Sequence, residues 1–181
     1  MLFRSLSKPN SAPWVLEGDI KGCFDNISFQ WILENIPMDK VVLHKWLRAG
    51  YVENGIHYPT RKGVPQGGIM SPTISNMVLD GLEGAVRCAV PRRCRINFDR
   101  YADDFIITGK SKSILEDAIQ PVVEGFLAER GLELLPEKTV ITHIKDGFKF
   151  LGQTFRKHGR VLHITPSTEG VQALMSKVGT T

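Results

Sequence analysis

Two adjacent aspartates, Asp103 and Asp104, stand between apolar stretches, with Phe98 before them and residues 105–107 (FII) after them. Carboxylates held this close raise each other's pKa unless a cation neutralises them. Clusters of carboxylate oxygens suit a hard divalent cation such as Mg²⁺. The pair alone is more often a plain turn dipeptide, because aspartate is favoured in turns. A metal site therefore requires a further carboxylate from elsewhere in the chain.

Asp19 is the candidate for that further carboxylate. It lies near the end of residues 14–20 (WVLEGDI), which read as a buried strand, where a carboxylate needs a partner or a metal. If this strand pairs beside the acidic bend, three carboxylates converge, and such a cluster can hold two Mg²⁺ ions for in-line phosphoryl transfer. Asp19 could instead cap the following turn, but Asp25 is nearer to the next helix and is the better capping candidate.

A glycine-rich loop at residues 63–68 (GVPQGG) precedes a helix start at Ser71-Pro72. The loop lacks the Lys-Ser/Thr ending of a P-loop, and no clean strand precedes it as in a dinucleotide-binding fold. It exposes Gln66 beside a helix N-terminus, which attracts phosphate or ribose oxygens. The alternative is a simple transition from loop to helix.

Other residues have ordinary explanations when taken alone. Periodicity makes Phe24 a core aromatic, and Lys138, beside a turn at Pro136-Glu137, a solvated lysine. Histidines and cysteines lack the spacing of a zinc site. Basic residues before and after the acidic pair could contact a nucleic-acid backbone or simply face solvent. These are Arg87, Arg92, Arg93, Arg95, Lys110 and Lys112.

The elements that must position these residues are helices interleaved with short strands. Strands are predicted at 14–20, on both sides of the bend at 102–104, and at 132–135, 139–144, 148–155 and 160–164. Asn54-Gly55 predicts a hairpin. Helices are predicted over 29–36, capped by Asp25 or Ser28, over 39–49, from Ser71 through Val86, over 113–130 with a kink at Pro121, and after Ser167. This order predicts an α+β fold, a mostly antiparallel sheet with helices packed on one face.

Composition sets limits but indicates no chemistry. The 181 residues, 42% hydrophobic and 23% charged, describe one compact globular domain rather than a disordered or fibrous chain. Apolar runs are too short to span a membrane, no signal peptide is evident, and three cysteines are too few for a secreted disulfide framework. We therefore expect a protein of the cytoplasm or an organellar matrix. The excess of 23 basic over 19 acidic residues permits an anionic partner.

Four segments, taken in order, resemble the palm of a reverse transcriptase of the group II intron (retron-type) class. They are EGDIKGCFD at 17–25, GVPQGGIMSP at 63–72 with the helix after it, YADD at 101–104, and LLPEKT at 134–139 followed by FLG at 150–152. Each segment alone is a weak pattern, but the ordered set is specific. The resemblance covers residues 14–155.

The resemblance implies catalytic roles for three aspartates and for two residues near them. Asp19, Asp103 and Asp104 would bind two Mg²⁺ ions, for which Mn²⁺ is a possible substitute. The carbonyl of Ile20 would be a further metal ligand. Lys138 is a candidate acid near the departing pyrophosphate. The implied reaction is attack of a DNA primer 3′-OH on the α-phosphate of a dNTP, copied from an RNA template such as a group II intron RNA.

The resemblance also implies residues that recognise the nucleotide and the template. Phe24 would be a gate whose ring crowds a ribose 2′-OH and so selects deoxynucleotides. Gln66, Gly67 and Tyr101 would shape the pocket for the incoming nucleotide and the template. These roles rest on the resemblance and not on periodicity.

The same resemblance divides the chain into an irregular lead-in from the fingers side (1–13), the palm (14–155) and the start of a thumb or connection (156–181). We therefore expect a truncated or fragmentary polymerase that lacks most of the fingers and thumb. One alternative is a non-catalytic RNA-binding or maturase remnant that assists intron splicing, which has no physical need for three clustered carboxylates. A viral-type RNA-directed RNA polymerase is a third possibility, against which Phe24 and the glycine-rich loop both argue.

Overall fold

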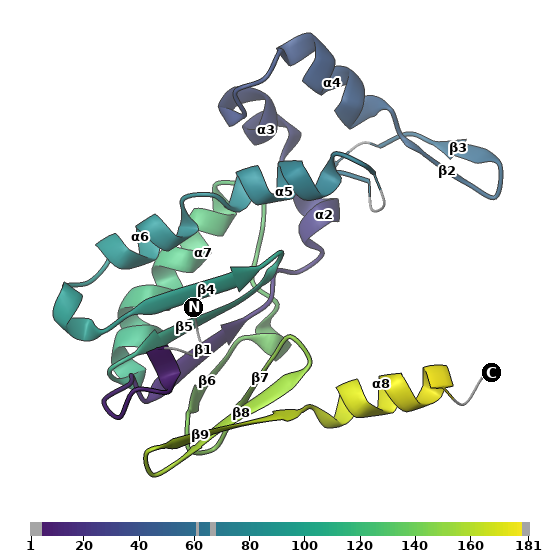
Figure 1. Ribbon diagram of the computed structural model, residues 1–181. Helices are drawn as coiled ribbons and strands as arrows, with labels where there is room; N and C mark the ends of the chain where they lie inside the picture. Colours follow the sequence, from purple (N-terminus) through teal and green to yellow (C-terminus); the bar gives the residue numbers. More distant parts are fainter. Residues whose placement is uncertain (1–4, 61, 66–67, 179–181) are drawn as a thin grey trace.

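The computed structural model describes residues 5–60, 62–65 and 68–178 (Figure 1). Its centre is a four-stranded antiparallel sheet with the strand order β4-β5-β1-β6. The strands span Trp14–Gly18 (β1), Asn97–Tyr101 (β4), Asp104–Gly109 (β5) and Val140–His143 (β6). The expected antiparallel sheet is therefore present, with β5 and β1 as its two central strands.

Alternate residues of the two central strands face two different hydrophobic clusters, as the pleat of a sheet requires. Leu16, Phe105 and Ile107 belong to the larger cluster, whereas Val15 and Ile106 belong to a smaller one on the other face. All five side chains are buried. Burial on both faces explains why these two strands consist almost entirely of apolar residues.

Helices cover the face of the sheet that carries the larger cluster (Figure 1). They are α5 (Ser71–Leu79), α6 (Leu82–Cys88) and α7 (Gln120–Ala128). The single helix predicted from Ser71 through Val86 is wrong, because the chain breaks at Asp80-Gly81. Gly81 adopts a φ of 89°, a left-handed conformation that ends α5 and reorients the chain before α6.

The predicted kink at Pro121 takes the form of a change in helix type. Residues Ile114–Ile119 form a π-helical segment, η2, and α7 begins at Gln120 with Pro121 in its first turn. Proline lacks the amide hydrogen that an α-helical ladder needs there, and π segments are one way in which helices absorb such a break. Gly131 follows with a φ of 74°, as expected at the helix end.

A three-stranded antiparallel sheet packs beside the central one and consists of β7 (Phe148–Phe150), β8 (Gln153–His158) and β9 (Val161–Pro166). The single strand predicted over 148–155 is therefore wrong. Leu151 and Gly152 have φ values of 50° and 72°, so the chain turns back on itself and the rings of Phe148 and Phe155 stack 4.9 Å apart. The strand predicted at 132–135 is reduced to a single bridge, between Leu134 and Ile20.

The amino-terminal lead-in is fastened to this second sheet by a buried lysine. The ammonium of Lys157 donates to the carbonyl oxygens of Leu6 (2.9 Å) and Lys8 (2.6 Å) and to the hydroxyl of Ser11 (2.6 Å). Burial lowers the pKa of Lys157. Leu6 is itself 1% exposed and belongs to the smaller hydrophobic cluster, so the described part of the lead-in, residues 5–13, is packed against the fold.

Between β1 and α5 the chain forms an excursion of short elements at the top of Figure 1. They are α2 (Cys23–Asn26), α3 (Phe29–Asn35), α4 (Lys40–Arg48), and the hairpin of β2 (Tyr51–Glu53) and β3 (Ile56–Tyr58). The hairpin turns at Asn54-Gly55 as predicted, with φ values of 52° and 78°. After β9, a final helix, α8 (Thr168–Val178), begins at Ser167, whose hydroxyl accepts from the amide of Gly170.

The helix caps of the excursion correct one prediction. The hydroxyl of Ser28 accepts from the amide of Trp31 and so caps α3, whereas Asp25 lies inside α2. Asp39 caps α4, at the start of the helix predicted over 39–49, and accepts from the amide of Val42 at 2.9 Å. The leucines of α4 are buried, whereas Val42 and Trp46 are 41% and 38% exposed.

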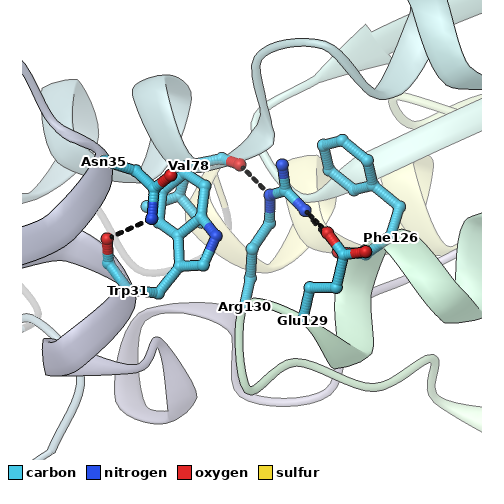
Figure 2. A network of polar contacts seen from close by, with 6 residues as sticks. All are labelled: Trp31, Asn35, Val78, Phe126, Glu129 and Arg130. Atoms are coloured by element: carbon cyan, nitrogen blue, oxygen red, sulfur yellow. Dashed lines mark hydrogen bonds and ion pairs between the residues drawn. The ribbon is translucent and has the colours of Figure 1, made fainter.

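Arg130 joins the excursion to the helical layer, and Figure 2 shows its guanidinium between the rings of Trp31 and Phe126. It donates to the carbonyl oxygen of Val78 in α5 (2.8 Å) and to that of Phe126 in α7 (2.7 Å), and it pairs with Glu129 at 3.2 Å. The guanidinium therefore contacts groups from three helices, α3, α5 and α7. None of the helices formed by the described residues is long and apolar enough to cross a bilayer.

Candidate active site

Asp19 and Asp104 meet at one end of the central sheet because of the register between β1 and β5. The last pair in that register joins Gly18 to Phe105, so Asp19 follows it on one strand and Asp104 precedes it on the other. Gly18 cannot carry a side chain, since a Cβ atom there would collide with the Phe105 ring. The expected pairing of the first strand with the acidic hairpin is confirmed.

Asp103 occupies the turn of the β4–β5 hairpin. Tyr101 pairs with Asp104, which leaves Ala102 and Asp103 as a two-residue turn, and Ala102 adopts a left-handed φ of 54°. Tyr101, at the end of β4, is 66% exposed. The predicted bend therefore lies where it was expected, with Asp104 as the first residue of β5.

The guanidinium of Arg100 holds this turn. It donates to the carbonyl oxygen of Ala102 at 2.7 Å and to the side-chain oxygen of Asn76, on α5, at 3.1 Å. One arginine therefore fixes both the strained residue of the turn and its distance from α5. Arg100 has no counterpart among the sequence predictions, although its position directly before the YADD segment is a usable signal.

Lys138 comes to the acidic end of the sheet from the short 3₁₀ segment η3 (Pro136–Lys138). Its ammonium lies 2.5 Å from Oδ2 of Asp19, a carboxylate that is 14% exposed, whereas the lysine side chain is 65% exposed. Asp19 raises the pKa of Lys138 most, and Asp104 and Asp103 raise it further. Lys138 is therefore largely exposed, as expected from the residues alone, and it is in addition the counter-ion of Asp19.

Partial burial raises the pKa of the Asp104 carboxyl, and the charges of Asp19 and Asp103 raise it further, while Lys138 opposes the shift. The three carboxylates are therefore electrostatic neighbours. Among residues 5–60, 62–65 and 68–178, however, no three His, Cys, Asp or Glu side chains form a ready metal site. The convergence predicted from the sequence is looser than a complete ligand cage.

Residues 133–135 fix the backbone around Asp19. The Asp19 carbonyl oxygen accepts from the amide of Leu135 at 2.9 Å, and the amide of Lys21 donates to Glu133 at 3.0 Å. Ile20 between them is buried, with 2% exposure, and bridges Leu134. Asp19 therefore sits on a backbone anchored on one side by β5 and on the other by the segment that carries Lys138.

Phe24 lies in α2, half-buried against the larger hydrophobic cluster, and the glycine-rich loop docks beside it. The amide of Val64 donates to the Phe24 carbonyl oxygen (2.6 Å), and the amide of Gly63 donates to that of Ile27 (3.1 Å). Gly63 has a φ of 70°, and a Cβ there would collide with the backbone of Phe24 and Asp25. The glycine is thus required for docking, which the sequence analysis did not recognise.

Two predicted residues of that loop, Gln66 and Gly67, lie outside the described residues. The loop on either side of them is held in place, since the hydroxyl of Ser71 donates to the carbonyl oxygen of Pro65 at 2.6 Å. The helix start predicted at Ser71-Pro72 is confirmed, but the Ser71 hydroxyl bonds back to the loop and does not cap α5. The described part of the loop lies against α2 and the start of α5, near Phe24.

A cavity of about 670 Å³ opens beside the acidic end of the sheet. Its walls come from the ends of β1 and β5, from η3, from the β7–β8 turn and from the start of α8. The lining residues include Asp19, Asp104, Lys138, Leu151, Gly152 and Glu169. Substrate-sized space is therefore available next to the carboxylates.

Glu17 is a carboxylate of this cavity that the sequence analysis did not select. Burial raises its pKa, although it accepts hydrogen bonds from the amide of Lys149 (3.1 Å) and the hydroxyl of Thr142 (3.4 Å). The signal for it is the alternation of residues 14–18, which places one acidic side chain inside an otherwise apolar strand. Its bonds tie β1 to β6 and β7, which gives it a structural role in the cavity wall.

Cys23 is also close to the acidic residues but is a poor nucleophile. It is 2% exposed, its sulfur lies 3.6 Å from the Ser75 hydroxyl, and burial raises its pKa. The thiolate is the reactive form of cysteine. The chemistry of this site therefore belongs to carboxylates and a lysine, a set that suits a hard cation and phosphate oxygens rather than acyl transfer.

Comparisons with known proteins agree with this chemistry. Residues 2–155 match the family profile described as Reverse transcriptase (RNA-dependent DNA polymerase). The chain is 29% identical to protein YkfC of Escherichia coli (strain K12), over 81% of this chain and 48% of that protein. It is also 29% identical to the group II intron-encoded protein LtrA of Lactococcus lactis subsp. cremoris, over 80% of this chain and 35% of that protein. It thus spans about a third to a half of these relatives.

Solved structures show the same fold. Apo telomerase from Candida tropicalis superposes with a TM-score of 0.68 at 16% identity, over 92% of this chain and 35% of that one. Telomerase from Candida albicans in complex with the TWJ fragment of telomeric RNA gives 0.62 at 16% identity, over 87% and 31%. At this identity the likeness concerns the fold alone, a palm-like α+β architecture.

Proposed function

The chain belongs to the reverse transcriptase family, and on that premise we propose that it carries the catalytic site of an RNA-directed DNA polymerase of the group II intron class. Asp19, Asp103 and Asp104 are the proposed catalytic carboxylates. The observation that carries the proposal is their arrangement: neighbouring strands bring Asp19 and Asp104 to one sheet end, and Lys138 responds to all three charges.

Divalent cations are generally used by this family, and the donors here suit them. We propose that Asp19, Asp103 and Asp104, with the carbonyl of Ile20, hold two Mg²⁺ ions or Mn²⁺ in their place. Cations bound there would favour deprotonation of the primer 3′-OH and stabilise charge on the departing pyrophosphate. Lys138 neutralises Asp19 until a cation enters, and its ammonium can then donate a proton to the leaving group.

The proposed substrates are a dNTP, a DNA primer and an RNA template, with group II intron RNA as the class of template. We assign Phe24 as the gate against a ribose 2′-OH, and Gln66, Gly67 and Tyr101 to the nucleotide and template pocket. Support for this comes from the docked loop at Gly63 and Val64, which places the glycine-rich segment against the backbone of Phe24. Positioning of this kind supplies much of the rate enhancement in phosphoryl transfer.

Residues 14–155 are the proposed palm, with 1–13 leading in from the fingers side and 156–181 starting a connection to the thumb. Such a protein would act where its intron RNA is made, in the cytoplasm or an organellar matrix. The competing function is a non-catalytic RNA-binding or maturase role in intron splicing. The three carboxylates favour catalysis, because crowding like charges costs free energy that a purely RNA-binding surface has no reason to bear.

Primer extension on an RNA template with dNTPs and Mg²⁺ tests the proposal. The chain would be assayed alone and fused behind the segment of LtrA that precedes the matched region. We expect extension by at least one form, and a loss of at least about 100-fold in Asp103→Asn. Asp146→Asn, an exposed carboxylate in another turn, is the matched control.

Two outcomes would count against polymerase activity. Unchanged extension by Asp103→Asn would remove that residue from the catalytic set. RNA binding by both forms without any extension would favour the maturase role.

A further inference from the structure

Five basic residues lie in two chain segments at the end of the β4–β5 hairpin that is opposite the acidic turn; Figure 1 shows the ribbon of this hairpin. Three come from the loop between α6 and β4, and two from the segment after β5. The amide of Lys110 donates to the carbonyl oxygen of Cys94 at 3.1 Å, so the two segments lie side by side. We call Arg92, Arg93, Arg95, Lys110 and Lys112 the basic patch.

The five residues of the basic patch outnumber the excess of basic over acidic residues in the whole chain. All five side chains are exposed, and residues 91–96 and 109–113 contain no acidic residue. Without these five, the 23 lysines and arginines of the chain fall to 18 against 19 acidic residues. The rest of the molecule therefore has a nearly neutral balance, and an approaching polyanion is attracted to this end of the sheet.

The patch is fixed in shape rather than scattered on a mobile loop. Arg92–Cys94 form a 3₁₀ turn, η1, and Arg95 follows it in a left-handed conformation with a φ of 56°. Arg95 also donates to the carbonyl oxygen of Asn10 at 2.9 Å, which anchors the loop to the lead-in. Within the described ranges, the side chains of the other four patch residues have no hydrogen-bond or ion-pair partner, which leaves their charges available to a ligand.

The position of the patch separates it from the copying site. Strand β5 runs from Asp104 to Gly109, so at about 3.3 Å per residue Lys110 lies roughly 20 Å from the acidic end. The substrate cavity opens at that acidic end, towards η3 and the β7–β8 turn. A ligand on the patch is therefore a different segment of nucleic acid from the one at the carboxylates.

The residue types of the patch indicate what kind of nucleic acid fits. Residues 91–96 (PRRCRI) and 109–113 (GKSKS) contain no aromatic side chain on which an unpaired base could stack. Guanidinium and ammonium groups bind phosphates, and serine hydroxyls add neutral donors. Side chains of these types contact a phosphate backbone without recognising the base sequence, which is how proteins bind RNA duplexes.

We propose that the basic patch binds the phosphate backbone of an RNA duplex and holds a structured part of the RNA away from the copied strand. The assignment of the duplex to RNA rests on the proposed function. The assignment of a phosphate-binding site rests on the basic patch alone. Binding through five phosphates predicts a slope of log affinity against log salt of about −4.5, or a loss of about 500-fold between 50 and 200 mM salt.

The test measures binding of a blunt 16-base-pair RNA duplex to the full chain at several salt concentrations. Arg92→Gln/Arg93→Gln and Lys110→Gln/Lys112→Gln should each reduce the slope by about 2, and together by about 4. The control is Lys145→Gln/Arg160→Gln, which removes two exposed cations of the second sheet region and lowers the net charge by two, as each patch double variant does. It should leave the slope within 1 of the parent value.

Asp103→Asn separates this proposal from the proposed function, since it should abolish primer extension and leave duplex binding unchanged. Equal effects of the patch and control variants would overturn the site. A DNA duplex of the same sequence bound clearly more tightly than the RNA duplex would overturn the assignment to RNA. Patch-dependent binding to phosphatidylglycerol vesicles without RNA binding would overturn it as well.

Discussion

Asp19 and Lys138, 119 residues apart in the chain, form an ion pair at the acidic end of the central sheet, with Nζ 2.5 Å from Oδ2. Asp19 is one of the carboxylates proposed to bind a divalent cation, and a lysine that neutralises it would compete with that cation. On this proposal the affinity for the cation depends on Lys138, which is not itself a proposed ligand.

Lys138→Met should tighten binding of Mn²⁺ to the chain, because the competing ammonium is gone. The lysine is largely exposed, so the gain is limited to a factor of about five. Lys138→Arg keeps the charge and should leave the affinity close to that of the parent. Isothermal titration with Mn²⁺ measures both, and weaker binding by the methionine variant would contradict the competition.

Asp104→Asn should stabilise the metal-free chain at neutral pH. The pKa of Asp104 is raised by partial burial and then by its two acidic neighbours, so the folded state holds this proton more tightly than the unfolded chain does. Stability is therefore lost as the pH rises from about 4 through the folded-state pKa. Urea midpoints should be higher for the variant at pH 7 and equal at pH 3.5. Asp146→Asn should show no such pH-dependent gain.

Gly63→Ala should weaken the docking of the glycine-rich loop on α2. The new methyl group meets the backbone of Phe24 and Asp25, and the residue must also keep a φ of 70°. Gly55→Ala is the matched control, because Gly55 has a similar φ of 78° with open space around it. Urea unfolding should show Gly63→Ala to be less stable than Gly55→Ala by at least about 1 kcal/mol. Equal losses would mean that only the backbone conformation matters.

Phe24→Ala should relax discrimination against ribonucleotides in the active form of the enzyme, by at least about tenfold. Removing the ring removes the group proposed to crowd the 2′-OH. Phe29→Ala is the control, since Phe29 is also half-buried against the same hydrophobic cluster. The ratio of incorporation efficiencies for dNTP and rNTP is the measurement. Unchanged selectivity in Phe24→Ala would remove the gate assignment.

Arg130→Lys should destabilise the fold by about 2 kcal/mol despite keeping the charge. Lysine lacks the planar fork that reaches the carbonyl oxygens of Val78 and Phe126 while lying against two rings (Figure 2). Arg160→Lys, at an exposed arginine, should change the free energy of unfolding by less than about 0.5 kcal/mol. Similar values for the two variants would show that the Arg130 network contributes nothing specific.

Local patterns predicted the parts of the fold that depend on local physics. The acidic hairpin and the Asn54-Gly55 turn both follow from period-two alternation and turn chemistry. The two breaks that were missed, at Gly81 and at Leu151-Gly152, depend on left-handed backbone conformations. Nothing in the surrounding apolar periodicity distinguishes those positions from the interior of a helix or strand.

Sequence periodicity predicted less of the candidate site than of the fold. The register that joins Gly18 to Phe105 connects positions far apart in the chain, and no local pattern encodes it. Residue patterns and the ordered family motifs both selected Asp19 and the acidic pair, but neither predicted the pairing of Lys138 with Asp19 or the contacts of Arg100 with the turn. Both contacts join positions that are defined only after the sheet has formed.

The buried ammonium of Lys157 has a consequence for how the molecule is made. Leu6 and Lys157 are separated by 151 residues, yet the carbonyl of one and the side chain of the other meet in the finished fold. A ribosome adding about 5 to 20 residues per second needs roughly 8 to 30 s to deliver β8 after Leu6 has emerged. Until then the carbonyl of Leu6 has no ammonium to bind, so a segment that is synthesised well before β8 settles only after β8 has been made.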